Sequence, residues 1–212
     1  MNIAIVGATG NVGRKLIEVL EKKNFPVTEA YLVASPNSAG KKIHFLGKEH
    51  TVINLEEFDF SKVNIAFFAA GSAIAEKWAP IAAEKTIVID NSKFFRKDPE
   101  IPLIVPEVNS KELPKFKNKN IIANANCSVI PIVVALKPLH DLYNVKRIVA
   151  STYQSVSGAG KAGMDELISQ TKEVLENKNV ESTNFTKQIA FNAIPHIDSF
   201  LENGSTKEEQ KS

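Results

Sequence analysis

The residue best suited to covalent chemistry is Cys127, the only cysteine among 212 residues. It stands in the run NANCS, between a short apolar stretch and a long apolar segment that follows Ser128. A helix N-terminus stabilises a thiolate, which is the nucleophilic form of cysteine. A lone cysteine is also often a small buried apolar residue. Its position at a strand end of an α/β domain, where ligands bind, favours a catalytic nucleophile.

A second chemical pattern is the glycine-rich segment GATGNVG, in which Gly7, Gly10 and Gly13 follow the first apolar run. A pyrophosphate needs exposed backbone N–H groups at a helix N-terminus, and glycines let the backbone turn tightly and approach the phosphates. Glycines at such a turn can be purely structural. The strand–turn–helix context favours a dinucleotide site.

The end of the second predicted strand bears on the choice between NAD and NADP. Enzymes that use NAD usually carry Asp or Glu there, to hold the ribose 2′-hydroxyl. Here the strand ends at Ser35, with Pro36, Asn37 and Ser38 next and Lys41 shortly after. Because no carboxylate would repel a 2′-phosphate, the sequence favours NADP, although no arginine sits at the strand end.

A parallel α/β sheet would position these residues. Short apolar runs alternate with helical patterns, which is typical of a doubly wound, Rossmann-like sheet. The predicted strands lie at 2–6, 30–35, 64–70, 86–92, 103–108 and 120–125, with helices at 12–23 and 72–84 and a candidate hairpin within 41–55. We therefore expect a dinucleotide-binding domain over residues 1–125.

The pattern changes after residue 125. A helix is expected directly after Cys127, then a strand that runs into a small-residue loop at 147–160, and an amphipathic helix at 163–178. These elements predict a second domain of α+β type over residues 126–212.

The composition excludes several function classes. The 26 basic and 24 acidic residues give a net charge of +2 without a basic stripe, so neither nucleic acid nor a membrane surface is an expected partner. A single cysteine forms no intrachain disulfide, and the N-terminus lacks the features of a signal peptide. We expect a cytoplasmic protein without a metal site.

Five segments, in the same order, resemble aspartate-semialdehyde dehydrogenase. They are GATGNVG at the start, DNSKFFRKDPEIPLIVPEVN at 90–109, NANCS at 124–128, TYQSVSGAG at 152–160 and NAIPHID at 192–198. The resemblance implies NADPH-dependent reductive dephosphorylation of β-aspartyl phosphate to aspartate semialdehyde, through a thioester. It also implies a homodimer that serves lysine, diaminopimelate, methionine and threonine biosynthesis. The family resemblance implies further that the second domain is an incomplete catalytic or dimerisation domain.

The resemblance assigns a role to individual residues. Cys127 would form the thioester, Gln154 would orient the substrate, and Arg96 would bind the phosphoryl group. Glu208 and Lys211, in a family E-x-x-K motif, would contact the substrate amine and the phosphate. Without the resemblance, Arg96 would read as a solvated loop residue and Lys211 as a frayed tail. The implied cofactor contacts are Gly7, Thr9, Gly10, Asn11, Val12, Ser35, Ser38, Gly71, Ser72, Ser157, Gly158 and Gly160.

The sequence departs from the family in two respects. Asn37 stands where several relatives carry a basic residue, which puts strict NADP selectivity in doubt. The family's catalytic histidine, and its arginine for the substrate carboxylate, lie beyond the last residue of this chain, and none of His44, His50, His140 and His196 replaces the histidine convincingly. We infer a truncated product, and expect weak NADP(H) binding and very low activity.

Three alternatives stay open at this stage. N-acetyl-glutamyl-phosphate reductase shares the fold and the acyl-phosphate chemistry. A catalytically silent cofactor-binding or dimerisation module would fit the missing histidine. A thiol hydrolase is weaker, since it leaves the glycine-rich turn unexplained.

Overall fold

The computed structural model describes residues 1–211, with Lys211 described by its backbone alone. The chain divides into two compact units, Met1–Val145 and Lys146–Ser212. The domain boundary predicted at residue 125 lies inside the first unit. The compact units need not coincide with functional domains, so the boundary at residue 125 stays a prediction.

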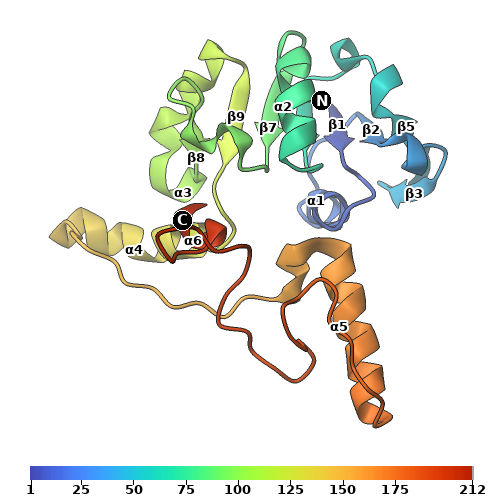
Figure 1. Ribbon diagram of the computed structural model, residues 1–212. Helices are drawn as coiled ribbons and strands as arrows, with labels where there is room; N and C mark the ends of the chain where they lie inside the picture. The colour runs from blue at the N-terminus through green and yellow to red at the C-terminus, as the bar shows by residue number, and fades with distance from the viewer. Residues whose placement is uncertain (212) are drawn as a thin grey trace. The chain divides into compact units, whose positions relative to one another are not determined.

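The first unit is built on a seven-stranded sheet in which every pair of neighbours is parallel (Figure 1). The strand order is β5-β2-β1-β6-β7-β9-β8, so the chain reverses its direction of travel between β1 and β6. This confirms the predicted Rossmann-like sheet. The strands are β1 (Asn2–Val6), β2 (Glu29–Ala34), β5 (Ile53–Asn54), β6 (Ile65–Phe68), β7 (Ile87–Asp90), β8 (Leu103–Ile104) and β9 (Ile121–Asn124).

Helices α1 (Asn11–Lys22) and α2 (Ser72–Ala83) pack into two separate apolar clusters, one on each side of the sheet. Successive residues of β1 show this alternation. Ile3 belongs to the α1 cluster and Ala4 to the α2 cluster, and both are fully buried. Both faces of the sheet are covered at β1, which reads as a continuous apolar run. In β6, β7 and β9 burial alternates, and every second residue is only half-buried.

The predicted hairpin is confirmed as β3 (Lys42–Phe45) paired antiparallel with β4 (Lys48–Thr51). Its two turn residues, Leu46 and Gly47, have φ values of 52° and 74°, as a tight hairpin with right-handed twist requires. The remaining connections are short helical turns. They are η1 (Pro36–Ser38), η2 (Leu55–Glu57), η3 (Phe60–Lys62), η4 (Phe94–Lys97), α3 (Pro106–Asn109) and η5 (Ser110–Asn118).

Helix α4 (Val129–Tyr143) begins two residues after Cys127, as predicted. Although it is rich in apolar residues, none of its 15 described residues is buried. Leu142 and Tyr143 near its end are 75% and 77% exposed. The helix ends at Asn144, whose φ of 51° supplies the left-handed terminating conformation.

The second unit contains η6 (Val156–Ala159), α5 (Gly160–Leu175) and α6 (Lys207–Lys211), drawn from orange to red in Figure 1. Helix α5 confirms the predicted amphipathic helix, shifted three residues toward the N-terminus. The strand predicted from residue 147 is wrong: residues 145–155 form no regular element. A strand needs a neighbouring strand for its hydrogen bonds. Within the described part of this unit, the only strand-like pairing is the isolated bridge between Phe200 and Thr206.

No helix among the described residues is both long enough and apolar enough to cross a bilayer.

Candidate functional site

The glycine-rich turn after β1 admits only glycine at two of its three positions. Gly7 has a φ of 88°, and a Cβ there would lie 2.6 Å from the carbonyl oxygen of Ala69. A Cβ on Gly13 would lie 2.2 Å from the carbonyl oxygen of Gly7. Gly7 therefore lets β1 and the β6 loop approach, and Gly13 lets α1 pack against its own turn, as in dinucleotide-binding folds.

Two helix N-termini flank the point where the strand order reverses. Helix α1 follows β1 with Gly10 as its N-cap, and α2 follows β6 with Gly71, and neither has a side-chain cap within the described residues. A Cβ on Gly71 would meet no atom within 4 Å, so the backbone faces open space. Uncapped N–H groups at such a position bind anions. The local structure therefore fits a dinucleotide pyrophosphate.

The predicted ribose-binding serines lie on the turn after β2. Ser35 is exposed and is the N-cap of η1, and Ser38 is half-buried. The hydroxyl of Thr9, in the glycine-rich turn, donates to Ser38 Oγ at 3.4 Å. The structure thus brings together the β1 and β2 turns, while Val12 is 52% exposed on the first turn of α1.

Cys127 lies on the turn between β9 and α4, and its side chain is exposed. The neighbouring Asn126 is 5% exposed, and its Oδ1 accepts hydrogen bonds from Ser128 N at 2.9 Å and Ser128 Oγ at 3.0 Å. The carbonyl oxygen of Asn126 also accepts from Val129 N and Ile130 N, the first N–H groups of α4. The hydrogen bonds of the buried Asn126 therefore fix the turn, while Cys127 is exposed, unlike a cysteine that fills an apolar core.

Arg96 is half-buried on η4, and it is not the solvated loop residue that a reading of the sequence without the family would suggest. Its Nε donates to the carbonyl oxygen of Asn124 at 2.9 Å, and its Nη2 donates to that of Asn91 at 3.2 Å. The side chains of these two asparagines are themselves linked, with Asn124 Nδ2 donating to Asn91 Oδ1 at 2.6 Å. Arg96 thus ties the loop after β7 to the end of β9, three residues before Cys127.

A buried carboxylate supports the same loop. Asp90 at the end of β7 is fully buried, and it accepts hydrogen bonds from Ser92 N at 3.0 Å and Ser92 Oγ at 2.6 Å. Burial raises the pKa of Asp90, against the opposing effects of the Ser92 hydrogen bonds and the Arg96 charge. The sequence patterns assigned no individual role to Asp90, Asn91 or Asn124. Their polar side chains at the ends of buried strands were the available signal.

Four of the predicted site residues, Gln154, Ser157, Gly158 and Gly160, lie in the first part of the second unit. Gln154 is exposed, and its Oε1 accepts from Thr152 Oγ1 at 3.2 Å. Ser157 N and Gly158 N donate to Ser155 Oγ and Ser155 O, both at 3.3 Å. Gly160 opens α5 with a φ of 80°, and no atom lies within 4 Å of a Cβ placed there. These hydrogen bonds shape a small-residue turn at the start of the helix.

The E-x-x-K motif falls on the short helix α6. Thr206 is 3% exposed and forms a capping box with Glu209: Thr206 N donates to Glu209 Oε2 at 2.6 Å, and Glu209 N donates to Thr206 Oγ1 at 3.2 Å. These hydrogen bonds lower the pKa of Glu209. The half-buried Glu208 lies between the two capping residues. The side chain of Lys211 lies outside the described residues.

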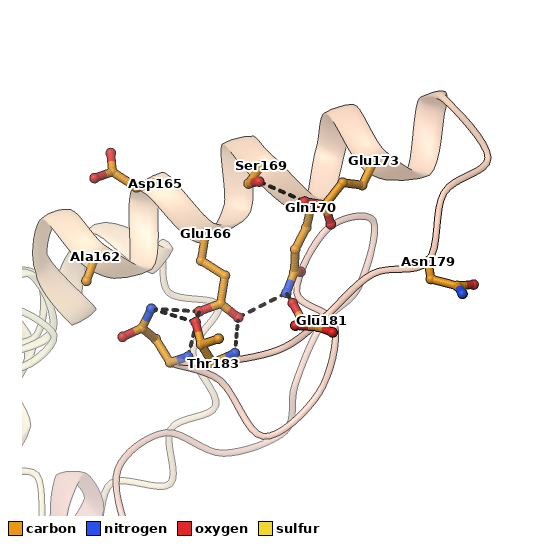
Figure 2. A pocket seen from close by; sticks show the side chains of 10 residues that line it. Ala162, Asp165, Glu166, Ser169, Gln170, Glu173, Asn179, Glu181 and Thr183 are labelled. Atoms are coloured by element: carbon orange, nitrogen blue, oxygen red, sulfur yellow. Dashed lines mark hydrogen bonds between the residues drawn. The ribbon is translucent and has the colours of Figure 1, made fainter.

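Helix α5 carries a polar network that sequence reasoning missed (Figure 2). Glu166, 8% exposed, accepts from Thr183 N and Oγ1 at 3.1 and 3.0 Å, and from Asn184 N and Nδ2 at 2.6 and 2.8 Å. One turn later Gln170, 1% exposed, donates to Glu181 O at 2.9 Å and accepts from Ile189 N at 2.8 Å. The i, i+4 spacing of two polar residues was the only sequence signal.

This network fixes the irregular chain after α5 onto the helix. Burial raises the pKa of Glu166, but the hydrogen bonds from Asn184 and Thr183 outweigh it and hold the pKa below its usual value. The same residues border a hollow of about 550 Å³ within the second unit. None of the predicted site residues lines this hollow, so we treat the network as structural.

The four histidines have local roles. His140 lies in the last turn of α4 and His44 is exposed on β3. The ring of His50 lies 3.1 Å from the carbonyl oxygen of Phe45, and the ring of His196 packs on Phe200 at 4.9 Å. None of the four belongs to the turn between β9 and α4 that carries Cys127.

Family models match both parts of the chain. The NAD-binding domain of semialdehyde dehydrogenase matches residues 2–116, and the dimerisation domain of the same family matches residues 136–212. The predicted boundary at residue 125 lies between the two matches.

Individual relatives agree. Aspartate-semialdehyde dehydrogenase 2 of Vibrio cholerae is 56% identical over 211 residues, covering 99% of this chain and 63% of that protein. The crystal structure of that organism's aspartate semialdehyde dehydrogenase II complexed with ASA is 55% identical, with a TM-score of 0.96 over 99% of this chain and 63% of the other. This chain therefore spans about 63% of the length of these relatives.

A more distant enzyme bears on the cofactor. Aspartate semialdehyde dehydrogenase from Candida albicans, solved with NADP, is 28% identical and matches with a TM-score of 0.52 over 68% of this chain and 48% of its own.

Proposed function

Because this chain belongs to the aspartate-semialdehyde dehydrogenase family, we propose that it carries the cofactor site and the nucleophile of an NADP-dependent reductase. The substrate is β-aspartyl phosphate and the products are aspartate semialdehyde and inorganic phosphate. The enzyme works in the cytoplasm, in the biosynthesis of the aspartate-derived amino acids.

The observation that carries this proposal is the exposed Cys127, on a turn held by Asn126 at the carboxyl edge of the sheet. The glycine-rich turn lies at the same edge, since β1 and β9 are parallel members of one sheet. The strand β6 beside that turn is two strand spacings from β9, or about 10 Å. Nucleophile and cofactor site therefore share one edge, where open α/β sheets bind ligands.

The chemistry follows from these groups. The thiolate of Cys127 attacks the acyl carbon of β-aspartyl phosphate, the C–O bond to phosphate breaks, and inorganic phosphate leaves with the electron pair. The product is a thioester on Cys127. When bound, NADPH would supply the hydride for the reduction of this thioester. The sulfur then leaves as thiolate when the aldehyde forms, which restores Cys127.

Four side chains serve the substrate in this proposal. Arg96 binds the phosphate as a fixed cation, since a guanidinium matches the geometry of phosphate oxygens. Lys211 is a second phosphate ligand, Glu208 contacts the substrate amine, and Gln154 orients the substrate. The capping box at Thr206 supports the assignment of Glu208, because it fixes the start of the helix that carries it.

NADP is the proposed cofactor. The family match is to an NAD-binding domain, and the Candida albicans relative was solved with NADP. Gly7, Thr9, Gly10, Asn11 and Val12 form the turn that fits a pyrophosphate. Ser35 and Ser38 would contact the 2′-phosphate. Gly71 and Ser72, with Ser157, Gly158 and Gly160, would line the cofactor cleft.

We also propose a homodimer. The dimerisation-domain model covers residues 136–212. Within that range Leu139, Leu142 and Tyr143 are 48%, 75% and 77% exposed on α4.

Acylation of Cys127 tests the proposed function without requiring the complete reaction. The 212-residue chain is incubated with β-aspartyl phosphate in the absence of cofactor, and its intact mass and tryptic peptides are measured. We expect an aspartyl adduct on the Cys127 peptide and equimolar phosphate release, both missing in Cys127→Ala. N-acetyl-glutamyl phosphate serves as the matched substrate. The proposed substrate would be refuted if N-acetyl-glutamyl phosphate acylated Cys127 faster than β-aspartyl phosphate. It would also be refuted if neither acyl phosphate gave an adduct.

A further inference from the structure

The turn that would receive the 2′-phosphate contains no cation of its own. Between β2 and β3 it reads Ser35-Pro36-Asn37-Ser38, and the nearest following lysines are Lys41 and Lys42. Lys42 is already paired, with its Nζ 3.0 Å from Glu49 Oε2 across the hairpin. A phosphate with two negative charges is held poorly by hydroxyl groups alone. A cation beside the turn is therefore needed. Lys41 is one candidate, and the structure offers a second on α1.

Arg14 on α1 lies beside that turn. Its Nε donates to the carbonyl oxygen of Thr9 at 3.1 Å, and the hydroxyl of Thr9 donates to Ser38 Oγ at 3.4 Å. Thr9 therefore connects Arg14 directly to the serine turn. The bond to Thr9 uses only Nε, and no other described residue accepts from the Arg14 guanidinium.

The charge of Arg14 is unusual for its position. It is the fourth residue of α1, and its own N–H donates to the carbonyl oxygen of Gly10, the N-cap. The helix dipole makes this end of a helix unfavourable for cations. Among the described residues no carboxylate lies within ion-pair distance of Arg14, whereas the adjacent Lys15 pairs with Glu18 at 2.7 Å. An exposed cation without an acidic partner, held where the dipole opposes it, suits an anionic ligand.

We propose that Arg14 binds the 2′-phosphate of NADPH, together with the hydroxyls of Ser35 and Ser38, and so determines the preference for NADP over NAD. Its two terminal nitrogens can donate to two phosphate oxygens while Nε remains on Thr9. The cation is thus supplied by α1 instead of the turn after β2, where Asn37 stands. This inference rests on the proposed function, because it assigns a residue to the NADP which that function uses.

Calorimetric titration with two adenosine probes tests the assignment on the 212-residue chain, with no substrate and no need for Cys127. Adenosine 2′,5′-bisphosphate carries the 2′-phosphate and 5′-AMP does not. The wild-type chain is expected to bind the bisphosphate more tightly. In Arg14→Ala the bisphosphate should bind about 10- to 100-fold more weakly, as for loss of hydrogen bonds to a charged group. Affinity for 5′-AMP should stay within about twofold.

Two further variants sharpen the test. Lys41→Ala removes the lysine that follows the serine turn and is the alternative cation for the 2′-phosphate. This variant should leave the preference for the bisphosphate unchanged. Asn37→Arg in the Arg14→Ala background places a cation on the serine turn and should restore that preference.

Each contrary result has a distinct meaning. A preference that survives Arg14→Ala but is lost in Lys41→Ala overturns only the role of Arg14. If Arg14→Ala weakens the binding of both probes equally, Arg14 only supports the turn through Thr9. Its proposed role in the preference for NADP is then refuted. If the wild-type chain binds both probes equally, NADP is the wrong cofactor, and that part of the proposed function fails as well. Acylation of Cys127 would be unaffected by any of these results.

Discussion

Arg96 Nε lies 2.9 Å from the carbonyl oxygen of Asn124, three residues before Cys127. The same side chain donates to Asn91 O, so one guanidinium joins the loop after β7 to the end of β9. The charge proposed to bind phosphate therefore also holds the backbone that leads to the nucleophile.

Removing Arg96 should cost stability as well as phosphate binding. Arg96→Ala leaves two half-buried carbonyl groups without their donors, so we expect the free energy of unfolding to fall by about 1–3 kcal/mol. Urea denaturation measures this change. Lys97→Ala, at the next and exposed position, should stay within about 0.5 kcal/mol of wild type. Equal effects of the two substitutions would show that the carbonyl contacts contribute nothing to stability.

The glycine-rich turn permits a paired test of packing. Gly13→Ala places a Cβ 2.2 Å from the carbonyl oxygen of Gly7, whereas the nearest atom to a Cβ on Gly10 is 3.4 Å away. Because backbone must move only in the first case, Gly13→Ala should destabilise the chain by about 1–3 kcal/mol or more. Gly10→Ala should cost clearly less. Thermal unfolding compares them, and the reverse order would contradict this account of the turn.

The Glu166 network predicts a loss of stability in acid. The folded-state pKa of Glu166 is below its ordinary value of 4.5, so its contribution is complete above that pH and disappears as the pH falls through the lowered pKa. Glu166→Gln removes the charge, and it can turn an amide NH₂ group toward Asn184 N and Nδ2, which are themselves donors. We expect a loss of about 1–3 kcal/mol at pH 7 and a flatter stability profile between about pH 5 and 3.

Glu202→Gln is the control for this effect, since Glu202 is an exposed carboxylate of the same unit. Urea unfolding at several pH values should give Glu202→Gln the profile of the wild type. A Glu166→Gln profile as steep as that of the wild type would place the acid-sensitive group elsewhere.

The capping box should govern the local stability of α6. Thr206→Ala removes the acceptor for Glu209 N, so amide exchange in Lys207–Gln210 should accelerate about three- to tenfold. Nuclear magnetic resonance with deuterium exchange follows these amides. Lys207→Ala alters the same helix without touching the box and should leave the rates nearly unchanged. Accelerated exchange in that control alone would contradict the role of Thr206.

Local patterns predicted the first unit well. The strand before the glycine-rich turn, β1, and the strand before Cys127, β9, are both short, mainly apolar runs bounded by polar or glycine residues. Gly7 and Gly13 were recognisable because their spacing reflects a steric need at a single turn. Cys127 was recognisable because β9 and α4 directly flank it in the sequence.

Contacts between distant residues were beyond such patterns. Asn91 and Asn124 are linked by their side chains, yet nothing in either segment alone indicates its partner. Helix α5 was predicted as amphipathic, but its buried residues are Gly163, Glu166 and Gln170, because the chain that covers it is bound through polar groups. The apolar run from Ile148 has strand character, but no neighbouring strand pairs with it among the described residues.

The position of β1 has a consequence for the birth of the protein on the ribosome. β1 precedes the other strands of the sheet along the chain, yet it lies inside the sheet, and its Val6 pairs with Phe68, about 60 residues later. At translation rates of about 5–20 residues per second, β1 must wait about 3–12 s for β6 to be synthesised. During that interval β2 can already pair with one edge of β1, but the edge that pairs with β6 has no partner strand. The apolar residues NIAIV therefore complete their backbone pairing only when β6 has left the ribosome.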